Sequence, residues 1–264
     1  TEVRIAFSSE ALYMAVTCFD SEPDRLYGNT MKRDEFLRAD DRFMWVFDPF
    51  LNGQGGYFFE MNPSGLMADA VMGPGGANNR QWDGIWDARV TRHAEGWSAE
   101  VELPFRTLNF DPALTAWGIN FQRTVRRKNE EVRWNGYARN QGVWQMSSAG
   151  VVQGLEGISQ GLGLDVKPYF VGRASAVPAE RSGSSYVGDV GADVFYNITP
   201  NLRANLTINT DFAETDVDDR QVNLTRFPLF FPERRQFFLE GSSLYRFAGA
   251  NGVNPFFSRR IGLT

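Results

Sequence analysis

The sequence predicts an all-β protein, and three observations lead to that prediction. Apolar and polar residues alternate over short runs, which is the period of a strand with one buried face. Clusters of Gly, Pro, Asn and Asp, which favour turns, separate these runs. No stretch shows the 3.6-residue period of an amphipathic helix, and aromatic residues, which favour strands, make up 14% of the chain. We therefore expect antiparallel sheets joined by short connections.

The clearest element is a hairpin across residues 86–103. Its apolar positions alternate with polar ones and are Trp86, Ala88, Val90, Trp97, Ala99, Val101 and Leu103. A slip of one residue would expose the tryptophans and bury the carboxylates, so the register is strongly determined. The exposed Glu100 and Glu102 can face Arg89 and Arg92 across the strands. Pro104 should end the second strand because it cannot donate a ladder hydrogen bond.

Similar runs predict the other strands of the first part of the chain. In order, the expected strands cover residues 3–7, 12–18, 43–47, 57–61, 66–71, 86–91, 97–103 and 117–124, with a return beginning at Val132. The connection at 20–41 is polar, and we expect a short helical turn near Phe36. Many short strands without a helix predict an antiparallel β-sandwich, immunoglobulin-like or jelly-roll-like, over residues 1–150.

The pattern changes after this region. We assign the Gly-rich residues 151–163 to a linker and residues 164–264 to a second domain. Its strands at 188–198 and 202–208 are longer, and each is apolar on one face and polar on the other. Both soluble sandwiches and transmembrane barrels contain such strands, and the alternation alone does not separate the two. The domain is an antiparallel β-meander with too few strands to close a barrel of at least eight.

Composition excludes several classes of function. The net charge is -5 and the arginines are scattered, which argues against a nucleic-acid partner. Cys18 is the only cysteine and His93, in a hairpin turn, the only histidine, so we expect no disulfide framework, thiolate metal cluster or catalytic triad. No apolar run is long enough for a membrane-spanning helix. Since the chain starts at Thr1 without a signal-like segment and stops abruptly, we expect a fragment of a longer protein.

No catalytic group stands out. A G-x-S-x-G match at 157–161 lacks a following helix and a downstream histidine, so we interpret it as a chance match. Glu100 and Glu102 are two residues apart on one strand face, and we interpret them as part of a solvated face rather than as a glycosidase acid/base pair. We therefore expect no catalytic residues, and hydrolysis of O-glycosyl bonds is the least favoured alternative.

Metal binding is left open. The acidic run at 216–219 lacks the glycine of a calcium loop. A structural Ca²⁺ near Asp40, Asp41, Asp69 or Asp83 is an alternative that the residues neither support nor exclude, and no other cofactor is expected.

The seven tryptophans fall into two groups. Four are in phase with the predicted buried faces and should lie in the core: Trp45, Trp86, Trp97 and Trp117. Three lie at or near loops, and they form a candidate carbohydrate-binding set with polar neighbours: Trp82, Trp134, Trp144, Arg80, Asp83 and Arg139. An exposed indole can stack on the C–H face of a sugar while polar side chains bind the hydroxyls at its rim. We hypothesise a sugar platform that uses at least one of the three, with packing as the alternative for each.

Several segments of residues 1–150 resemble a family 9 carbohydrate-binding module. These segments are 45–48, 57–65, 82–86, 96–105 and 117–121. Residues from about 164, above all the run 209–241, resemble the domain of unknown function that follows such modules in outer-membrane proteins of Gram-negative bacteria. The two resemblances imply glycan binding for the first domain and part of an outer-membrane β-barrel for the second.

These observations and resemblances together predict a non-enzymatic sandwich that binds polysaccharide or oligosaccharide as an accessory to carbohydrate catabolism. The resemblance implies that the C-terminal barrel contacts outer-membrane lipid, with the sandwich in the periplasm or at the cell surface. The alternative is a structural or assembly protein of the envelope, whose aromatic loops contact another protein instead of a sugar.

Overall fold

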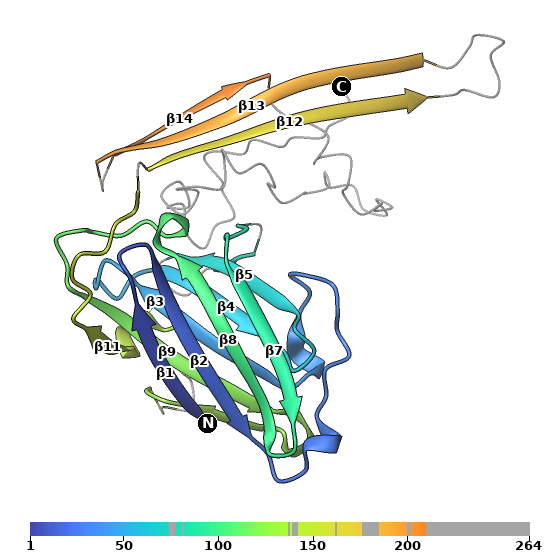
Figure 1. Cartoon of the computed structure of the whole chain (residues 1–264), viewed down its shortest axis with the longest axis vertical. Coiled ribbons are helices and arrows are strands. Elements are labelled where there is room, and N and C mark those ends of the chain that lie inside the picture. Colours follow the sequence, from blue (N-terminus) through green and yellow to red (C-terminus); the bar gives the residue numbers. More distant parts are fainter. Residues whose placement is uncertain are drawn as a thin grey trace, which may run out of the picture. The chain divides into compact units, whose positions relative to one another are not determined.

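The computed structural model describes residues 1–73, 78–80, 82–136, 138, 142–161, 163–175, 185–199 and 202–209. Within these ranges the chain forms antiparallel strands and short 3-10 turns but no α-helix, which confirms the all-β prediction (Figure 1). The chain divides into two compact units, Thr1–Gly161 and Leu162–Thr264, and each is described by itself.

The first unit is a sandwich of two antiparallel sheets (Figure 1). The first sheet has the order β1-β2-β8-β7, formed by Glu2–Phe7, Ala11–Phe19, Gly96–Pro104 and Asp87–His93. The second sheet has the order β10-β9-β3-β4-β5-β6, formed by Glu130–Arg133, Ala116–Val125, Arg42–Asp48, Gly56–Met61, Met67–Met72 and Asn78–Asn79. A further strand, β11 at Gly150–Gln153, also pairs with β9. The 3-10 turns are Pro23–Arg25, Leu37–Ala39, Phe105–Thr107, Arg126–Lys128 and Met146–Ser148.

The predicted hairpin is β7 and β8, and β8 ends at Pro104 as expected. Register places Arg89 opposite Glu100, as predicted, but Asp87 opposite Glu102. Arg92 does not face a carboxylate of β8: it donates to the Pro63 carbonyl oxygen (3.0 Å) and to Ser64 Oγ (2.7 Å). Burial of the apolar face, rather than ion pairs across the strands, therefore determines the register of the hairpin. Arg92 links the hairpin to the turn at Pro63 and Ser64.

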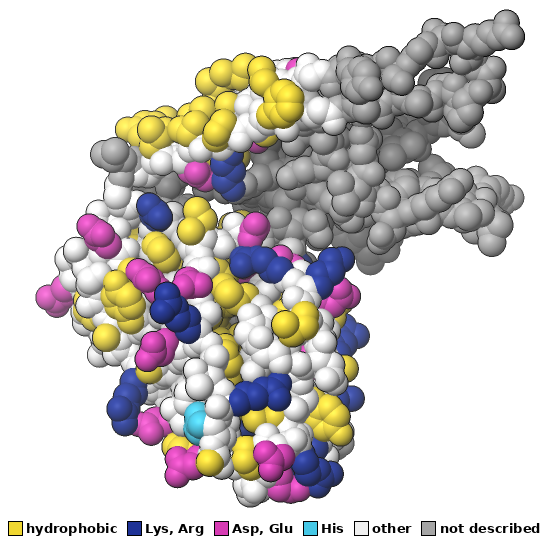
Figure 2. Space-filling model, turned by 45° about the vertical axis from the view of Figure 1, so that its right-hand side comes forward, with side chains coloured by type: hydrophobic (Ala, Val, Ile, Leu, Met, Phe, Trp, Pro, Cys, Tyr) yellow, Lys and Arg dark blue, Asp and Glu magenta, His cyan; other side chains and the backbone are white. Residues whose placement is uncertain are grey.

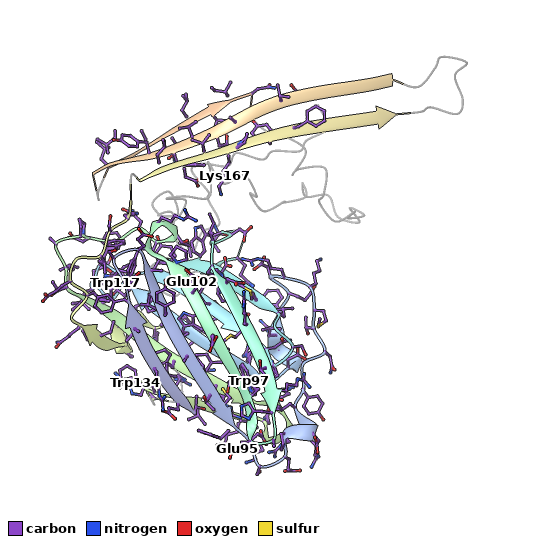
Figure 3. All side chains as sticks on the ribbon, viewed as in Figure 1. Glu95, Trp97, Glu102, Trp117, Trp134 and Lys167 are labelled. Carbon is purple, nitrogen blue, oxygen red and sulfur yellow. The ribbon has the colours of Figure 1, made fainter. Side chains whose placement is uncertain are left out.

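The four tryptophans predicted for the core are all buried between the sheets. Trp45 stacks on Phe59 with ring centroids 5.3 Å apart and meets Trp86 edge-on at 5.4 Å. Figure 3 shows Trp97 and Trp117 within the sandwich. Each such aromatic pair adds about 0.5–1.5 kcal/mol of stability beyond that from area burial. Because all four tryptophans are buried, the prediction that they lie in the core is confirmed.

The central strands of the second sheet, β3, β4, β5 and β9, are buried on both faces, which the alternation does not predict. Met44 and Val46 point away from the sandwich core yet are buried in a second cluster, whose other members are Phe58, Ala70, Met72, Val143 and Met146. Asn120 and Gln122, the polar residues that alternate with the apolar positions of β9, are also buried. The segment that carries Val143 and Met146 covers this outer face, so polar residues of the central strands are enclosed.

The predicted linker begins too early. Residues 150–153 form β11, with Val152 opposite Trp117, and Leu155 is buried in the main core. The β-branched Val151 and Val152 fit a strand, and their pairing continues the ladder along β9. This part of the Gly-rich stretch therefore belongs to the sandwich.

The second unit contains a three-stranded antiparallel sheet with the order β12-β13-β14, formed by Leu164–Ser175, Ser185–Thr199 and Leu202–Ile208. The strands expected at 188–198 and 202–208 are present as β13 and β14. One face of this sheet is apolar and 47–73% exposed, and it carries Leu164, Val166, Phe170, Val190, Tyr196, Ile198, Leu202, Leu206 and Ile208. Figure 2 shows these strands as a band of hydrophobic side chains.

No helix among the described residues is long and apolar enough to cross a bilayer. The acidic run at 216–219 and nearly all of the run 209–241 lie outside the described residues.

Candidate functional site

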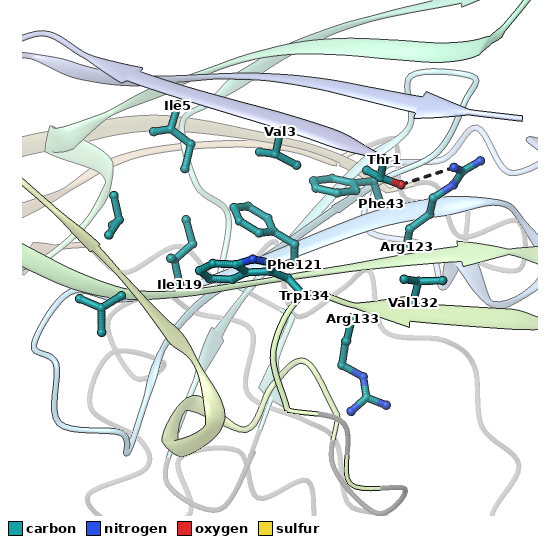
Figure 4. Close-up of a pocket in the computed structure, with 12 residues that line it drawn as sticks. Thr1, Val3, Ile5, Phe43, Ile119, Phe121, Arg123, Val132, Arg133 and Trp134 are labelled. Carbon is teal, nitrogen blue, oxygen red and sulfur yellow. Dashed lines mark hydrogen bonds between the residues drawn. The ribbon is translucent and has the colours of Figure 1, made fainter.

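A groove of about 610 Å³ opens between the two sheets, at the edge where β1 faces β10 and β11 (Figure 4). It is lined by Thr1, Val3, Ile5, Phe43, Ile119, Phe121, Arg123, Val132, Arg133, Trp134, Val151 and Val152. Its volume is in the range of small-molecule sites, about 300–1,000 Å³.

The groove follows from the way in which β9 shares its edge between two strands. Residues 122–125 of β9 pair with β10, whereas residues 116–119 pair with β11. Trp134 lies at the break between them, where its backbone N–H donates to the Phe121 carbonyl oxygen (3.0 Å). Asn120 holds the next residue, because Asn135 N–H donates to its Oδ1 and its Nδ2 donates to the Asn135 carbonyl oxygen. The backbone therefore fixes the place of Trp134.

Trp134 lies at the mouth of the groove and is 56% exposed. Its ring contacts Phe121 at a centroid distance of 5.7 Å, and Phe121 stacks on Phe43 at 5.9 Å. A Cβ at Gly150 would lie 2.3 Å from the indole, so a glycine is needed there for the ring to take this position. Three aromatic rings therefore run from the surface towards the core.

The charged residues of the groove are engaged elsewhere. Arg123 Nη1 donates to the Phe19 carbonyl oxygen (2.6 Å) and to Thr1 Oγ1 (3.4 Å), and Nη2 lies 3.5 Å from Asp20. Arg133 lies opposite Gln122, and the side chain of Gln122 is on the outer face of the second sheet. Figure 4 shows the guanidinium of Arg133 directed away from the groove. Arg133 Nη1 donates to the Gly136 carbonyl oxygen (2.8 Å). The charged side chains of the groove are consequently not available to a ligand, and most of the remaining lining side chains are apolar.

The other two tryptophans of the candidate set do not line this groove. Trp144 is 45% exposed, and its ring lies against Gly142. Trp82, expected at the surface, is only 7% exposed, because its indole packs against Tyr57 (4.9 Å) and Phe59 (6.1 Å). The expectation that Trp82 is an exposed stacking residue is therefore wrong.

The polar members of the candidate set make internal contacts. Arg80 Nη1 donates to buried Glu60 at 2.7 Å, and its guanidinium lies 4.8 Å from the ring centre of Phe36. Asp83 accepts a hydrogen bond from Arg33 at 2.9 Å. Arg139 lies outside the described residues. Of the five predicted residues that the structure describes, Trp134 is the one that lines the groove.

Buried Asp69 holds the segment that carries Trp82 and Trp86. Its carboxylate accepts hydrogen bonds from Trp86 Nε1 (2.8 Å), Gly84 N–H (3.0 Å) and Arg33 Nη2 (2.8 Å). Burial raises the pKa of Asp69 to about 6, in spite of these donors.

The other aspartates considered for calcium also bind protein donors. Asp40 accepts from the N–H groups of Asn29 and Thr30 and from Asn62 Nδ2, and Asp41 accepts from the N–H of Tyr27. In the part of the chain that the structure describes, no three His, Cys, Asp or Glu side chains form a group that could hold a metal ion.

The remaining lining residues were not singled out from the sequence. Val3, Ile5, Val132 and Val152 are ordinary strand residues, and only the pairing of β10 and β11 with one strand brings Val132 and Val152 opposite Val3 and Ile5 of β1. The one available indication was that Val132 and Trp134 are two residues apart, which places both side chains on one face of a strand.

Residues 161–264 match the family described as "Domain of unknown function (DUF5916)". No curated protein matches the sequence. Among solved structures, a candidate carbohydrate-binding protein from Bacteroides uniformis ATCC 8492 has a TM-score of 0.48 and 11% identity, over 57% of this chain and 76% of that one. A family 9 carbohydrate-binding module from Caldicellulosiruptor kristjanssonii, in complex with cellotriose, has a TM-score of 0.42 and 15% identity, over 60% and 78%. The same kind of module in complex with glucose gives 0.38 and 13%, over 57% and 74%.

Proposed function

We propose that the sandwich binds carbohydrate and that Trp134 is the residue on which a sugar ring stacks. The observation that carries this proposal is a half-exposed indole held by the backbone at the mouth of a 610 Å³ groove. Tryptophan presents a large flat apolar face, which complements the C–H face of a pyranose. Trp144 is also about half exposed, but it is not among the residues that line the groove.

Comparison of the variants Trp134→Ala and Trp144→Ala tests this proposal. The full chain is titrated with a panel of xylo-oligosaccharides, cello-oligosaccharides and substituted monosaccharides, and binding is measured by calorimetry. We expect Trp134→Ala to weaken binding about tenfold, or about 1.4 kcal/mol, because stacking is lost. Trp144→Ala, an exchange of the same residue type at similar exposure, should leave the affinity within about twofold of the unchanged chain.

Two outcomes contradict the proposal: no saccharide binds the unchanged chain, or binding is lost in Trp144→Ala and kept in Trp134→Ala. Unchanged melting temperatures for both variants ensure that a loss of affinity reports on the site rather than on folding.

We further propose that the second unit contacts outer-membrane lipid as part of a β-barrel, so that the sandwich captures saccharide at the cell envelope for catabolism. The exposed apolar face of β12-β13-β14 supports this, because the opposite face carries Asp165, Lys167, Asp193 and Asn205. The strands of a membrane barrel alternate in the same way, with apolar residues toward lipid and polar residues toward the lumen. The full-length protein should fractionate with the outer membrane and show heat-modifiable gel mobility, and complete recovery in the periplasm would contradict this.

A second candidate function, a structural or assembly role in the envelope, is favoured by one observation. Within the described residues β1 pairs with β2 alone, and its free edge lies beside the apolar groove. Edge strands of this kind can bind an extended peptide by adding a strand to the sheet. This role becomes the better one if the saccharide panel shows no binding.

A further inference from the structure

The groove differs from a site for a fully hydroxylated sugar in one respect, which is that few polar side chains are available in it. Nine of its twelve lining residues are apolar. The polar ones are Thr1, Arg123 and Arg133. Thr1 and Arg123 bond to each other at one end of the groove, and the Arg133 side chain points to the other face of the sheet (Figure 4).

The apolar walls face each other across the space between the sheets. Val3 and Ile5 of β1 project from one side, and Ile119 and Phe121 of β9 from the other (Figure 4). Val132, opposite the inward-facing Arg123, forms the lip beside Trp134 and is about half exposed. Val152, opposite Trp117, extends the apolar wall along β11. A ring stacked on Trp134 would therefore direct one substituent into an apolar space and keep its remaining edge in water.

Hydroxyl and methyl substituents behave oppositely in such a space. A hydroxyl group that leaves water without finding a new partner lowers affinity by about tenfold. A methyl group that leaves water raises affinity by about fourfold. The selectivity of the groove therefore depends on the difference between the effect of a hydroxyl group and the effect of a methyl group on affinity.

We propose that the groove selects saccharides that carry a methyl-bearing substituent over their fully hydroxylated counterparts. Two kinds of sugar share this chemistry, the 6-deoxyhexoses and the O-acetylated or N-acetylated sugars. This inference rests on the proposed function, since it names the class of saccharide that the Trp134 site takes.

Matched pairs of ligands test the inference on the full chain, in a detergent that is not a glycoside. L-fucose is compared with L-galactose, N-acetylglucosamine with glucose, and acetylated xylo-oligosaccharides with the same sample after alkaline deacetylation. We expect the methyl-bearing member to bind at least fivefold more tightly in one or more pairs. The pair that shows the preference distinguishes a deoxy methyl group from an acetyl methyl group.

The variant Val132→Thr sharpens this test, because threonine has nearly the shape of valine, suits a strand and adds a hydroxyl at the lip. The preference should fall by threefold or more in this variant. Val90→Thr in β7, the same exchange on a strand that does not line the groove, should leave the preference unchanged.

The outcomes separate the inference from the proposed function. Equal binding of both members of every pair, with a loss in Trp134→Ala, overturns the inference and leaves carbohydrate binding in place. A preference for the hydroxylated members overturns it as well. No binding by any ligand overturns both.

Discussion

In β8 of the sandwich, the apolar positions Trp97, Val101 and Leu103 are at most 4% exposed, whereas in β12 Leu164 and Val166 are more than 50% exposed. Both strands alternate apolar and polar residues with the same period. In β8 the apolar face packs against a second sheet, but in β12 it faces outward while the polar face is partly shielded.

The difference shows what alternation specifies. A period of two determines which residues share a face of a strand, and the partner of that face determines its burial. A core between two sheets and an apolar face turned outward therefore arise from one pattern. The two units should respond differently to changes on their apolar faces, and two experiments test this. A third tests a buried carboxylate of the sandwich.

The largest effect is expected from Trp45→Ala, which removes a buried indole that contacts Phe59 and Trp86. The free energy of unfolding should fall by about 3–5 kcal/mol. Phe170→Ala, an aromatic exchange on the exposed face of β12, should change it by less than about 0.5 kcal/mol. Urea unfolding is followed by circular dichroism, which reports on the strands of both units, and by tryptophan fluorescence, which reports on the first unit because all seven tryptophans lie there. A similar loss of unfolding free energy in both variants would contradict the difference in burial between the two apolar faces.

The next effect is expected from Leu206→Arg in β14, on the exposed apolar face. A charge on a lipid-facing position costs about 2–4 kcal/mol near the middle of a bilayer. Co-flotation of the full chain with phosphatidylcholine vesicles should therefore decrease strongly. Asn205→Arg, one residue away on the opposite face, should decrease it much less. Equal flotation of both variants and the unchanged chain would argue against lipid contact through this face.

A smaller effect is expected from Asp69, whose pKa burial raises from 3.8 to about 6. The folded protein holds this proton over a pH range in which the unfolded chain has lost it, so the group stabilises the fold below about pH 4 and this contribution is lost as the pH rises through 6. The loss should be about 1–3 kcal/mol between pH 4 and 7. Asp69→Asn should remove it, whereas Asp83→Asn, which changes an exposed partner of the same Arg33, should retain it. Urea midpoints across this range measure the difference, and parallel profiles for all three proteins would show that Asp69 does not titrate there.

Much of the sandwich could be predicted because its apolar residues follow strand periodicity closely. The hairpins β1-β2 and β7-β8 and the burial of four tryptophans follow from the alternation. The burial of Asn120 and Gln122 could not be predicted in this way. It depends on a segment distant in sequence, with Val143 and Met146, that covers the outer face of the sheet.

The candidate site was predictable only in part, for a similar reason. Trp82 and Trp134 both have polar neighbours in the sequence, and nothing local separates them. Trp82 is buried because Tyr57 and Phe59 of β4 meet its ring, and Trp134 is exposed because it lies where β9 changes partners. Tertiary contacts, rather than the local sequence, therefore determine which of the two indoles is exposed.

The division of β9 between β10 and β11 has an evolutionary consequence. The segment between β10 and β11 is held at both ends by β9: Trp134 bonds to Phe121, and Gly150 pairs with Ile119. Exchanges of Trp134 itself can alter the rim of the groove while both ladders persist and while Val143 and Met146 still cover the outer face. Relatives of this protein could thus acquire new ligand preferences by varying this position, without rebuilding the framework that supports it.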